Sequence, residues 1–280
     1  MRLSRLTIMV VAALLTTSLS LGATDNKKCL PVNLEKRKLA FKGGEKLVFT
    51  IHYKWGLINA DVAQATLRLD STVFNGKSCY HGSLKGKTQK IYESVFKLKE
   101  DFDCWFTTDG FKPMKFTRDC REGGYWCTNL YTYGSDHINA QINNSRKGEF
   151  TVSLPLDECT YDIATMLFLI RNMDISRLKA GGRYPMTYAC DHHIRNIFFR
   201  YYGVENRKVS GKGMVRCHKF GFEMPKGEAF DGESDLYAWF TDDGNRVPVY
   251  FVAPLKIGQV RGRLYSAEGL KHSFSSIVSQ

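Results

Sequence analysis

Apolar and polar residues alternate along most of the chain, beginning with the stretch KLVFTIHYKW. One side of this stretch carries Leu47, Phe49, Ile51, Tyr53 and Trp55, and from Phe49 onward they alternate with the polar residues Thr50, His52 and Lys54. A period of two is typical of a β-strand with one buried face. We therefore predict a strand here, with these five side chains directed inward.

The same pattern continues in the next segment, where Ala63, Ala65 and Leu67 share one face. The linking sequence GLINAD predicts that the two strands are antiparallel neighbours, and Asn75-Gly76 predicts a further hairpin turn. The segment KIYESVFKLKEDFDCWF fits a strand or a helix. Beyond Gly182, further strand patterns stand in RYPMTYAC, IRNIFFRYYGV, MVRCHKFGFEM, DLYAWFT, VPVYFVA and GQVRGRLY.

One segment, CTYDIATMLFLIRNM, has a helical pattern. We predict a helix capped by Thr160, with Asp162 in its first turn and its end at Arg171. The run from Ile163 to Ile170 is apolar almost all round, so this helix should be buried. With no linker after the first residues, we expect a single β-rich domain over 24–280. It should hold about ten to twelve antiparallel strands in a β-barrel or strongly curved sheet with one buried α-helix.

Two stretches far apart in the chain are nearly the same: WFTTDGFKPMKF at 105–116 and WFTDDGNRVPVYF at 239–251. Each predicts a β-hairpin, because glycine accepts a positive φ in the turn and proline is tolerated where a strand begins. The pair indicates either a duplicated half-domain or one turn sequence that arose twice. The flanking residues show no further similarity, which favours the second interpretation.

The first 23 residues have the layout of a secretory signal peptide. Arg2 and Arg5 precede an apolar run from Leu6 to about Leu15, and small residues follow as far as Ala23. This run is shorter than the roughly 20 residues that span a bilayer. We therefore expect an exported protein that does not span a membrane.

The cysteine count changes the picture, because all eight cysteines lie after the predicted leader. An even number in an oxidising compartment predicts disulfides, although eight cysteines allow roughly a hundred pairings. The stretch CREGGYWC centres Cys120 and Cys127 on a Gly-Gly turn, which makes them disulfide candidates. The alternative is a pair of facing thiols, because hydrogen-bonded cross-strand positions are not the easiest geometry for a bridge.

The formal net charge of +12 comes from scattered basic residues with short clusters at EKRK, ENRK and VRGRL. These clusters indicate either a solvated surface or contact with an anionic surface. Nucleic acid is not an expected partner of an exported protein.

Motifs for chemistry are largely missing. The chain has no Gly-x-Ser-x-Gly elbow and no His-Glu-x-x-His motif. His192 and His193 in CDHHIRN predict an exposed turn, and a metal site there would need His218 or a carboxylate nearby. We therefore assign no catalytic residue and no metal ligand, and we expect no cofactor.

Several blocks in one order resemble a known family. They are GEKLVFTIHYKWGLINADVAQATLRL, FKLKEDFDCWF, KPMKFTRDCREGGY, DIATMLFLIRNMD and WFTDDGNRVPVYFVAPLKIGQVRGRL. Together they resemble the bacterial envelope family catalogued as domain of unknown function 3108, over roughly residues 40 to 265. The resemblance implies an exported, mostly β-structured protein in the periplasm of Gram-negative bacteria. It implies no reaction, ligand or site residue.

These observations favour a periplasmic, non-catalytic binding or carrier protein for an apolar, lipid-like or acyl ligand. The ligand-binding candidates are Leu47, Phe49, Ile51, Tyr53, Trp55, Ala63 and Ala65. The competing interpretation is that the same residues pack a closed core. A second hypothesis is an envelope interaction or assembly factor that meets an anionic polymer or a protein partner through Arg207, Lys208, Arg261 and Arg263. A third is an unrecognised glycan-acting enzyme. Oligomeric state stays open.

Overall fold

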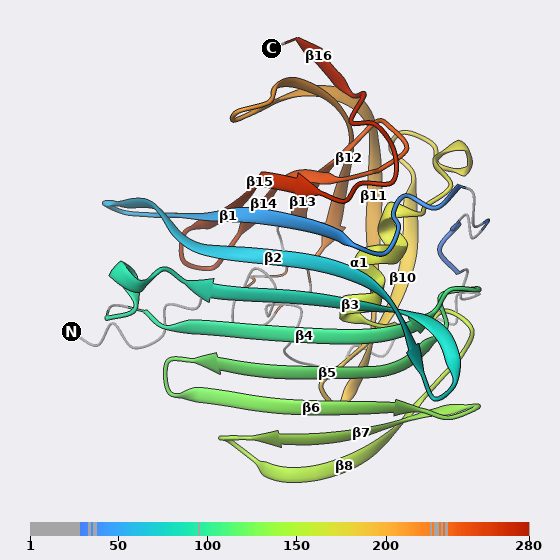
Figure 1. Ribbon diagram of the computed structural model, residues 1–280. Helices are drawn as coiled ribbons and strands as arrows, with labels where there is room; N and C mark the ends of the chain where they lie inside the picture. The colour runs from blue at the N-terminus through green and yellow to red at the C-terminus, as the bar shows by residue number, and fades with distance from the viewer. Residues whose placement is uncertain are drawn as a thin grey trace.

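A computed structural model describes residues 29–32, 35, 38–94, 96–224, 226, 230, 232 and 235–279. The predicted leader at 1–23 lies outside these residues. Figure 1 shows the described chain as a large sheet that curves around one helix.

The described residues form sixteen strands, one α-helix and short 3-10 turns. The first eight strands are β1 (Glu45–Trp55), β2 (Ile58–Phe74), β3 (Lys77–Thr88), β4 (Leu98–Thr107), β5 (Pro113–Glu122), β6 (Tyr125–Tyr133), β7 (His137–Asn144) and β8 (Gly148–Pro155). Next come β9 (Thr160–Asp162), α1 (Ile163–Arg171), β10 (Arg183–Cys190), β11 (His193–Val209) and β12 (Gly213–Glu223). The chain ends with β13 (Asp235–Thr241), β14 (Pro248–Pro254), β15 (Gln259–Glu268) and β16 (Ile277–Ser279). The 3-10 turns include η2 (Lys90–Tyr92) and η3 (Ile175–Arg177).

All of these strands belong to one sheet with the order β8-β7-β6-β5-β4-β3-β2-β1-β15-β14-β13-β12-β11-β10-β9, and β16 pairs with β12. Strands β8 and β9 stand at its two ends and do not pair with each other. The fold class predicted from the sequence is therefore confirmed as the curved sheet with one helix, and the sheet is not closed within the described residues. It holds more strands than the ten to twelve expected, because hairpin β7–β8 and the short strands β9 and β16 extend the sheet.

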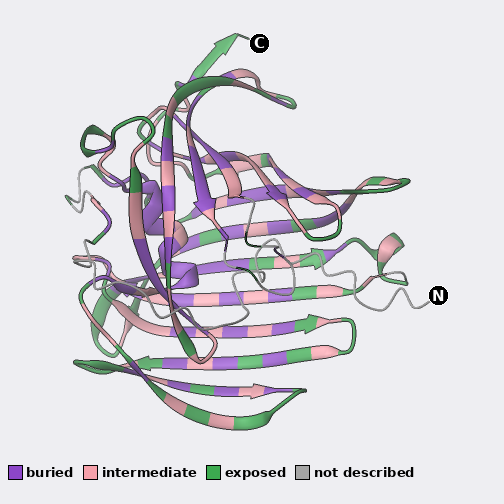
Figure 2. Cartoon of the chain, turned by 180° about the vertical axis from the view of Figure 1, so that it is seen from behind, coloured by how far each residue is buried: buried purple, intermediate pink, exposed green. Residues whose placement is uncertain are grey.

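The alternation of apolar and polar residues in the sequence corresponds to a buried and an exposed face of the sheet. Figure 2 shows buried and exposed residues taking turns along most strands, as expected when one face covers a core and the other meets solvent. The ambiguous segment before Thr107 divides into the turn η2 and strand β4.

Helix α1 lies against the concave face of the sheet and contacts β3, β4 and β10 (Figure 1). Eight of its nine residues are buried, as the all-round apolar pattern predicted. The ring of Phe168 packs directly on Gly82 of β3, where any side chain would clash with it. Gly82 therefore lets the helix approach the sheet closely.

The predicted N-cap of α1 was wrong by two residues. Asp162 is the cap, since its carboxylate accepts a hydrogen bond from the backbone N–H of Thr165 at 2.7 Å. Thr160 belongs to β9 instead, and its hydroxyl donates to Asp157 at 2.7 Å. Thr160 pairs with Thr187 in the sheet, so pairing with β10 overrides its capping preference.

The two Trp-Phe-Thr segments occupy corresponding places in the sheet. In each hairpin the threonine hydroxyl accepts a backbone N–H across the turn, from Lys112 to Thr107 at 3.0 Å and from Val247 to Thr241 at 2.8 Å. The correspondence reaches the preceding strand, because Thr107 pairs with Cys79 and Thr241 pairs with Cys217. Strands β1–β6 and β10–β15 are both consecutive meanders with a long second strand. The structure thus favours a duplicated half-domain over two independent turns.

Side chains connect the turn between β10 and β11 to β5 and β6, strands with which β10 and β11 do not pair. Asp191, in the turn between β10 and β11, accepts hydrogen bonds from Arg118 of β5 at 3.2 Å and from the Asn129 amide of β6 at 2.9 Å. The Tyr131 hydroxyl donates to the backbone oxygen of Asp191 at 2.6 Å. Arg118 also pairs with buried Glu100 at 2.8 Å, so its charge is compensated on both sides.

A fully buried ion pair ties α1 to the start of the sheet. Arg171 and Glu45 form two hydrogen bonds, and their side chains are 0% and 2% exposed. Arg171 donates in addition to the backbone oxygen of Asn245, in the turn between β13 and β14, at 2.9 Å. The helix end, β1 and the second Trp-Phe-Thr hairpin are therefore held at one point.

The pairing of the cysteines agrees in part with the prediction from the sequence. Cys29 and Cys159 form a disulfide, which joins the N-terminal segment to the residues before β9. Cys120 and Cys127 face each other across β5 and β6, as the Gly-Gly turn required. Their Sγ atoms are 2.8 Å apart and the thiols are free.

Breaking the buried Arg171–Glu45 pair should be costly. We expect Glu45→Met to lower the free energy of unfolding by about 3–5 kcal/mol, because it leaves a buried guanidinium without its counter-charge. The double variant Glu45→Met/Arg171→Met should recover much of this loss. Urea unfolding measures both. The control Glu268→Gln, in the exposed Lys46–Glu268 pair at 3.7 Å, should cost about 1 kcal/mol or less. Equal losses for the buried and exposed variants would contradict this role.

We expect Cys120 and Cys127 to form a second disulfide in protein secreted into an oxidising compartment, since their sulfurs need to approach by less than about 1 Å. Peptide mapping under non-reducing conditions, with free thiols alkylated first, would detect the linked pair. Alkylation of both residues in otherwise oxidised protein would establish the facing-thiol alternative.

Candidate functional site

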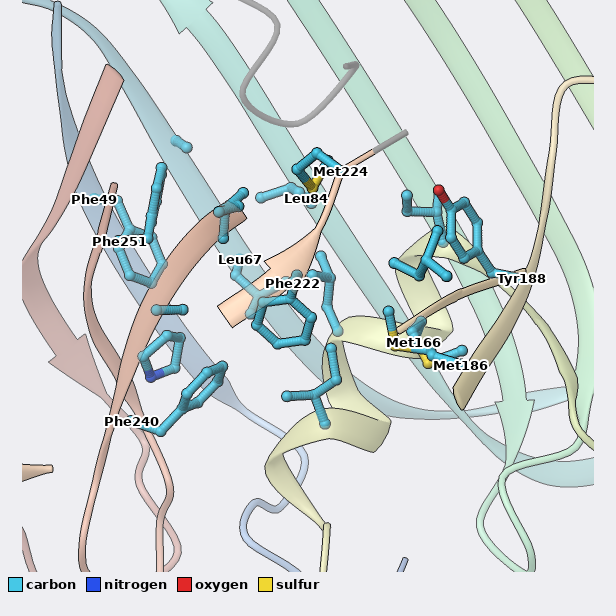
Figure 3. Close-up of a pocket in the computed structure, with 18 of the residues that line it drawn as sticks. Phe49, Leu67, Leu84, Met166, Met186, Tyr188, Phe222, Met224, Phe240 and Phe251 are labelled. Atoms are coloured by element: carbon cyan, nitrogen blue, oxygen red, sulfur yellow. The ribbon is translucent and has the colours of Figure 1, made fainter. Parts of the chain in front are cut away.

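A hollow of about 190 Å³ lies between α1 and the inner face of the sheet. It is partly open to the outside, and Figure 3 shows its side chains converging from several strands and from the helix. Strands of both meanders contribute to its wall, so the hollow exists only in the complete fold.

The first meander supplies one wall through residues that alternate along three neighbouring strands. These are Phe49 and Ile51 of β1, Ala65 and Leu67 of β2, and Leu84 of β3. Phe49 pairs with Ala65 in the sheet, so a large and a small side chain stand next to each other on the inner face. The small volume of Ala65 leaves part of the hollow unfilled.

Helix α1 and the second meander supply the remaining walls. Their lining residues are Ile163, Met166, Leu167 and Ile170 of α1; Met186 and Tyr188 of β10; Ile197 of β11; Phe222 of β12; Met224; Leu236, Ala238 and Phe240 of β13; and Pro248 and Phe251 of β14. Three of these are methionines, whose unbranched side chains adapt to irregular space. This wall can therefore adjust to ligands of different shape.

The lining is almost entirely apolar. The Tyr188 hydroxyl is the single polar side-chain group among the lining residues in the described part of the chain. A buried water needs two to four polar partners, so such a surface holds water poorly, and apolar cavities of similar size bind small apolar molecules. The described residues that line the hollow include no carboxylate, imidazole or amine for proton transfer.

The structure places the ligand-binding candidates from the sequence in three settings. Phe49, Ile51 and Ala65 line the hollow. Leu47 and Ala63 are buried in the surrounding core without lining it.

The last two candidates lie toward the far end of β1. Tyr53 is buried there, and its hydroxyl donates to the backbone oxygen of Ile257 at 2.9 Å. Trp55 is 41% exposed at the strand end, so it is not part of the inner surface.

The lining residues of the second meander were missed. Their strands show the same alternation as β1 and β2, with Leu236, Ala238 and Phe240 on one face of β13. What the sequence does not contain is the pairing that brings these strands opposite β1. For the lining residues of α1, the sequence predicted only that the helix is buried. An apolar pattern on all sides of a helix does not show which side borders a cavity.

Buried polar groups hold the helix that forms one wall. The Asp162 carboxylate, which accepts a hydrogen bond from Thr165, also accepts one from the Tyr133 hydroxyl of β6 at 3.1 Å. Removal from water raises the pKa of Asp162 to about 6, although these hydrogen bonds favour its charged form.

The histidine-rich turn provides no metal site in the described residues. His192 and His193 lie ring against ring with centroids 3.9 Å apart, while His218 is hydrogen-bonded to Tyr201 at 2.8 Å. The one group with suitable spacing consists of Cys29, Glu158 and Cys159, and its two sulfurs are joined in the disulfide.

Comparisons with known proteins show a family and, separately, a shared fold. The family described as "Protein of unknown function (DUF3108)" matches residues 48–265. A similar solved structure is the β-barrel-like protein of domain of unknown function DUF1849 from Brucella abortus, with a TM-score of 0.51 and 11% identity. The similarity covers 80% of this chain and 96% of that one, and it shows a shared fold. A search of the curated proteins found no match. No helix in the described part of the chain has the length and apolar character to cross a bilayer.

Stability should depend on pH through Asp162. Its pKa is higher in the folded protein, about 6, than the ordinary value of 3.8. Its favourable contribution is therefore fully present below about pH 4 and is lost as the pH rises through 6. Asparagine also caps helices and does not titrate. The stability of Asp162→Asn relative to the native chain should thus increase from pH 4 to pH 7, by on the order of 3 kcal/mol at most.

Denaturant unfolding at a series of pH values measures this difference. Asp174→Asn, at the partly exposed cap of η3 where the carboxylate accepts from the backbone N–H of Ser176 at 3.2 Å, serves as control. A stability difference for Asp162→Asn that does not change between pH 4 and pH 7 would show that the carboxyl titrates normally.

Proposed function

We propose that this chain, which belongs to the protein family of unknown function DUF3108, is a binding or carrier protein for a small apolar or acyl-like ligand. The ligand would occupy the hollow between α1 and the inner face of the sheet. The observation that carries the proposal is a partly open space of about 190 Å³ whose described lining residues carry a single polar side-chain group.

The lining explains why such a ligand would bind. Transfer of a methylene group from water to an apolar site contributes about 0.8 kcal/mol, so several methylenes in the hollow would offset part of the cost of association. Since Tyr188 has the only hydroxyl among the lining residues that the structure describes, selectivity would come from shape and apolar area. No acid or base group stands among the described lining residues, which favours binding over catalysis.

The proposal includes a place of action. The leader-like residues 1–23 support export, and the family resemblance noted from the sequence supports the periplasm of a Gram-negative cell. A disulfide between Cys29 and Cys159 suits an oxidising compartment. A carrier in that compartment would shield an apolar molecule from water.

Filling the hollow should weaken ligand binding. We expect N-phenyl-1-naphthylamine to bind the native chain saturably with one site, with decanoate as competitor. Ala65→Phe should weaken binding at least tenfold, about 1.4 kcal/mol, because the new ring takes the ligand's space. Fluorescence titration measures both.

The matched control is Gln64→Phe, which places the same ring on the exposed opposite face of β2. It should bind the probe as the native chain does. Thermal melts must show both variants folded. Undiminished, saturable binding by folded Ala65→Phe would exclude this hollow as the site.

A further inference from the structure

The outer face of strands β11–β15 carries a row of aromatic rings covered by cations. Neighbouring rings have centroids 5.8 Å apart for Tyr202–Tyr237, 6.5 Å for Tyr237–Trp239 and 5.5 Å for Trp239–Tyr250. We call this row, together with Arg207, Lys219, Arg261 and Arg263, the outer stripe. It lies on the face of the sheet opposite the apolar hollow.

The strand register shows that the outer stripe runs across the strands. Lys219 of β12 pairs with Trp239 of β13, which pairs with Tyr250 of β14, which pairs with Arg263 of β15. Adjacent strands are about 4.8 Å apart, so these four positions cover roughly 15 Å in a line. A linear ligand lying across the strands could meet all of them.

Among the cations of the outer stripe, Arg207 stacks closely on two aromatic rings. Its guanidinium lies 4.3 Å from the ring centroid of Trp239 and 4.1 Å from that of Tyr250. Two aromatic contacts fix the plane of the group and leave its N–H edge available. Within the described residues, no carboxylate lies within salt-bridge distance of Arg207.

Charge along the stripe is only partly compensated. Lys219 is 3.7 Å from Glu205, and Arg263 is 2.6 Å from Asp61. Arg261 donates to the neutral Gln259 side chain at 2.7 Å and has no acidic partner among the described residues. Two guanidinium groups, Arg207 and Arg261, therefore lack counter-charges. A fixed guanidinium with free N–H groups is suited to bidentate binding of an oxyanion.

The surface is poorly suited to a membrane or to nucleic acid. Trp239 is 5% exposed, and Tyr237 and Tyr250 are partly buried, so these rings do not protrude as bilayer anchors would. The cations already cover the ring faces, whereas single-stranded nucleic acid needs open faces for base stacking. Tyr202, 41% exposed, is the ring with the most accessible surface.

We infer that the outer stripe binds an acidic polysaccharide, whose carboxylate or sulfate groups pair with Arg207 and Arg261. Such a site is independent of the apolar hollow, because it uses the other face of the sheet. It would allow the protein to attach to a polyanionic glycan while its hollow holds a ligand.

The test is binding of the full mature chain to polygalacturonate and to dextran sulfate, with neutral dextran as the uncharged comparison. Biolayer interferometry at low salt should show binding to at least one of the two acidic polymers and none to neutral dextran. Raising the ionic strength to 0.5 M should weaken binding at least tenfold, because exposed charges are screened.

Variants locate the site. Arg207→Gln and Arg261→Gln should each weaken binding about fivefold to tenfold. Arg207→Lys should lose nearly as much, since it keeps the charge without the planar fork. The control Lys87→Gln removes one exposed cation from β3 and should change affinity less than twofold. Because Arg261 covers no ring in the stripe, its variant reports on binding even if Arg207→Gln unfolds.

Three outcomes would overturn the inference. One is no binding of either acidic polymer at low salt. Another is an equal loss for Lys87→Gln, which would indicate diffuse attraction to a basic protein. The last is tighter binding to vesicles containing phosphatidylglycerol or to single-stranded DNA than to both polysaccharides. None of these outcomes bears on the apolar hollow, since probe binding there is measured separately.

Discussion

The buried pair of Arg171 and Glu45 is the interaction on which the rest of the structure depends. It fixes the end of α1 to the first residue of β1, and through Asn245 it fixes both to the hairpin between β13 and β14. A guanidinium without contact to water must keep its partner, so this junction has little freedom. This junction fixes the C-terminal end of the helix against the curved sheet, and the position of the helix decides where space remains.

The hollow follows from this arrangement. A sheet that curves without closing needs something to cover its inner face, and one helix of nine residues covers only part of it. Strands of both meanders complete the wall, and Ala65 and Ala238 are too small to fill what the helix leaves. Asp191, in the turn between β10 and β11, is hydrogen-bonded to side chains of β5 and β6, and these contacts connect strands that have no backbone pairing with one another.

The two faces of the second meander are chemically distinct. Its inner face presents side chains such as Phe222, Ala238 and Phe251 to the hollow. Its outer face carries aromatic rings with arginine and lysine stacked on them. Strand alternation makes this separation possible, because neighbouring residues point to opposite sides. The two faces could therefore each bind a ligand without using the same side chains.

The sequence by itself determined the class of the fold, the inner face of β1 and β2, the single buried helix and its end at Arg171. These features follow from periodicity, which is local. It also placed Cys120 opposite Cys127, because a two-residue turn sets the register of a hairpin. Only the tertiary structure decided that Phe49, Ile51 and Ala65 border a space while Leu47 and Ala63 pack in the core, and that Trp55 is largely outside. Pairing of β1 with β15, the position of α1 and the stacking of Arg207 join residues far apart in the chain. No local pattern encodes such contacts, because they depend on how the whole sheet curves.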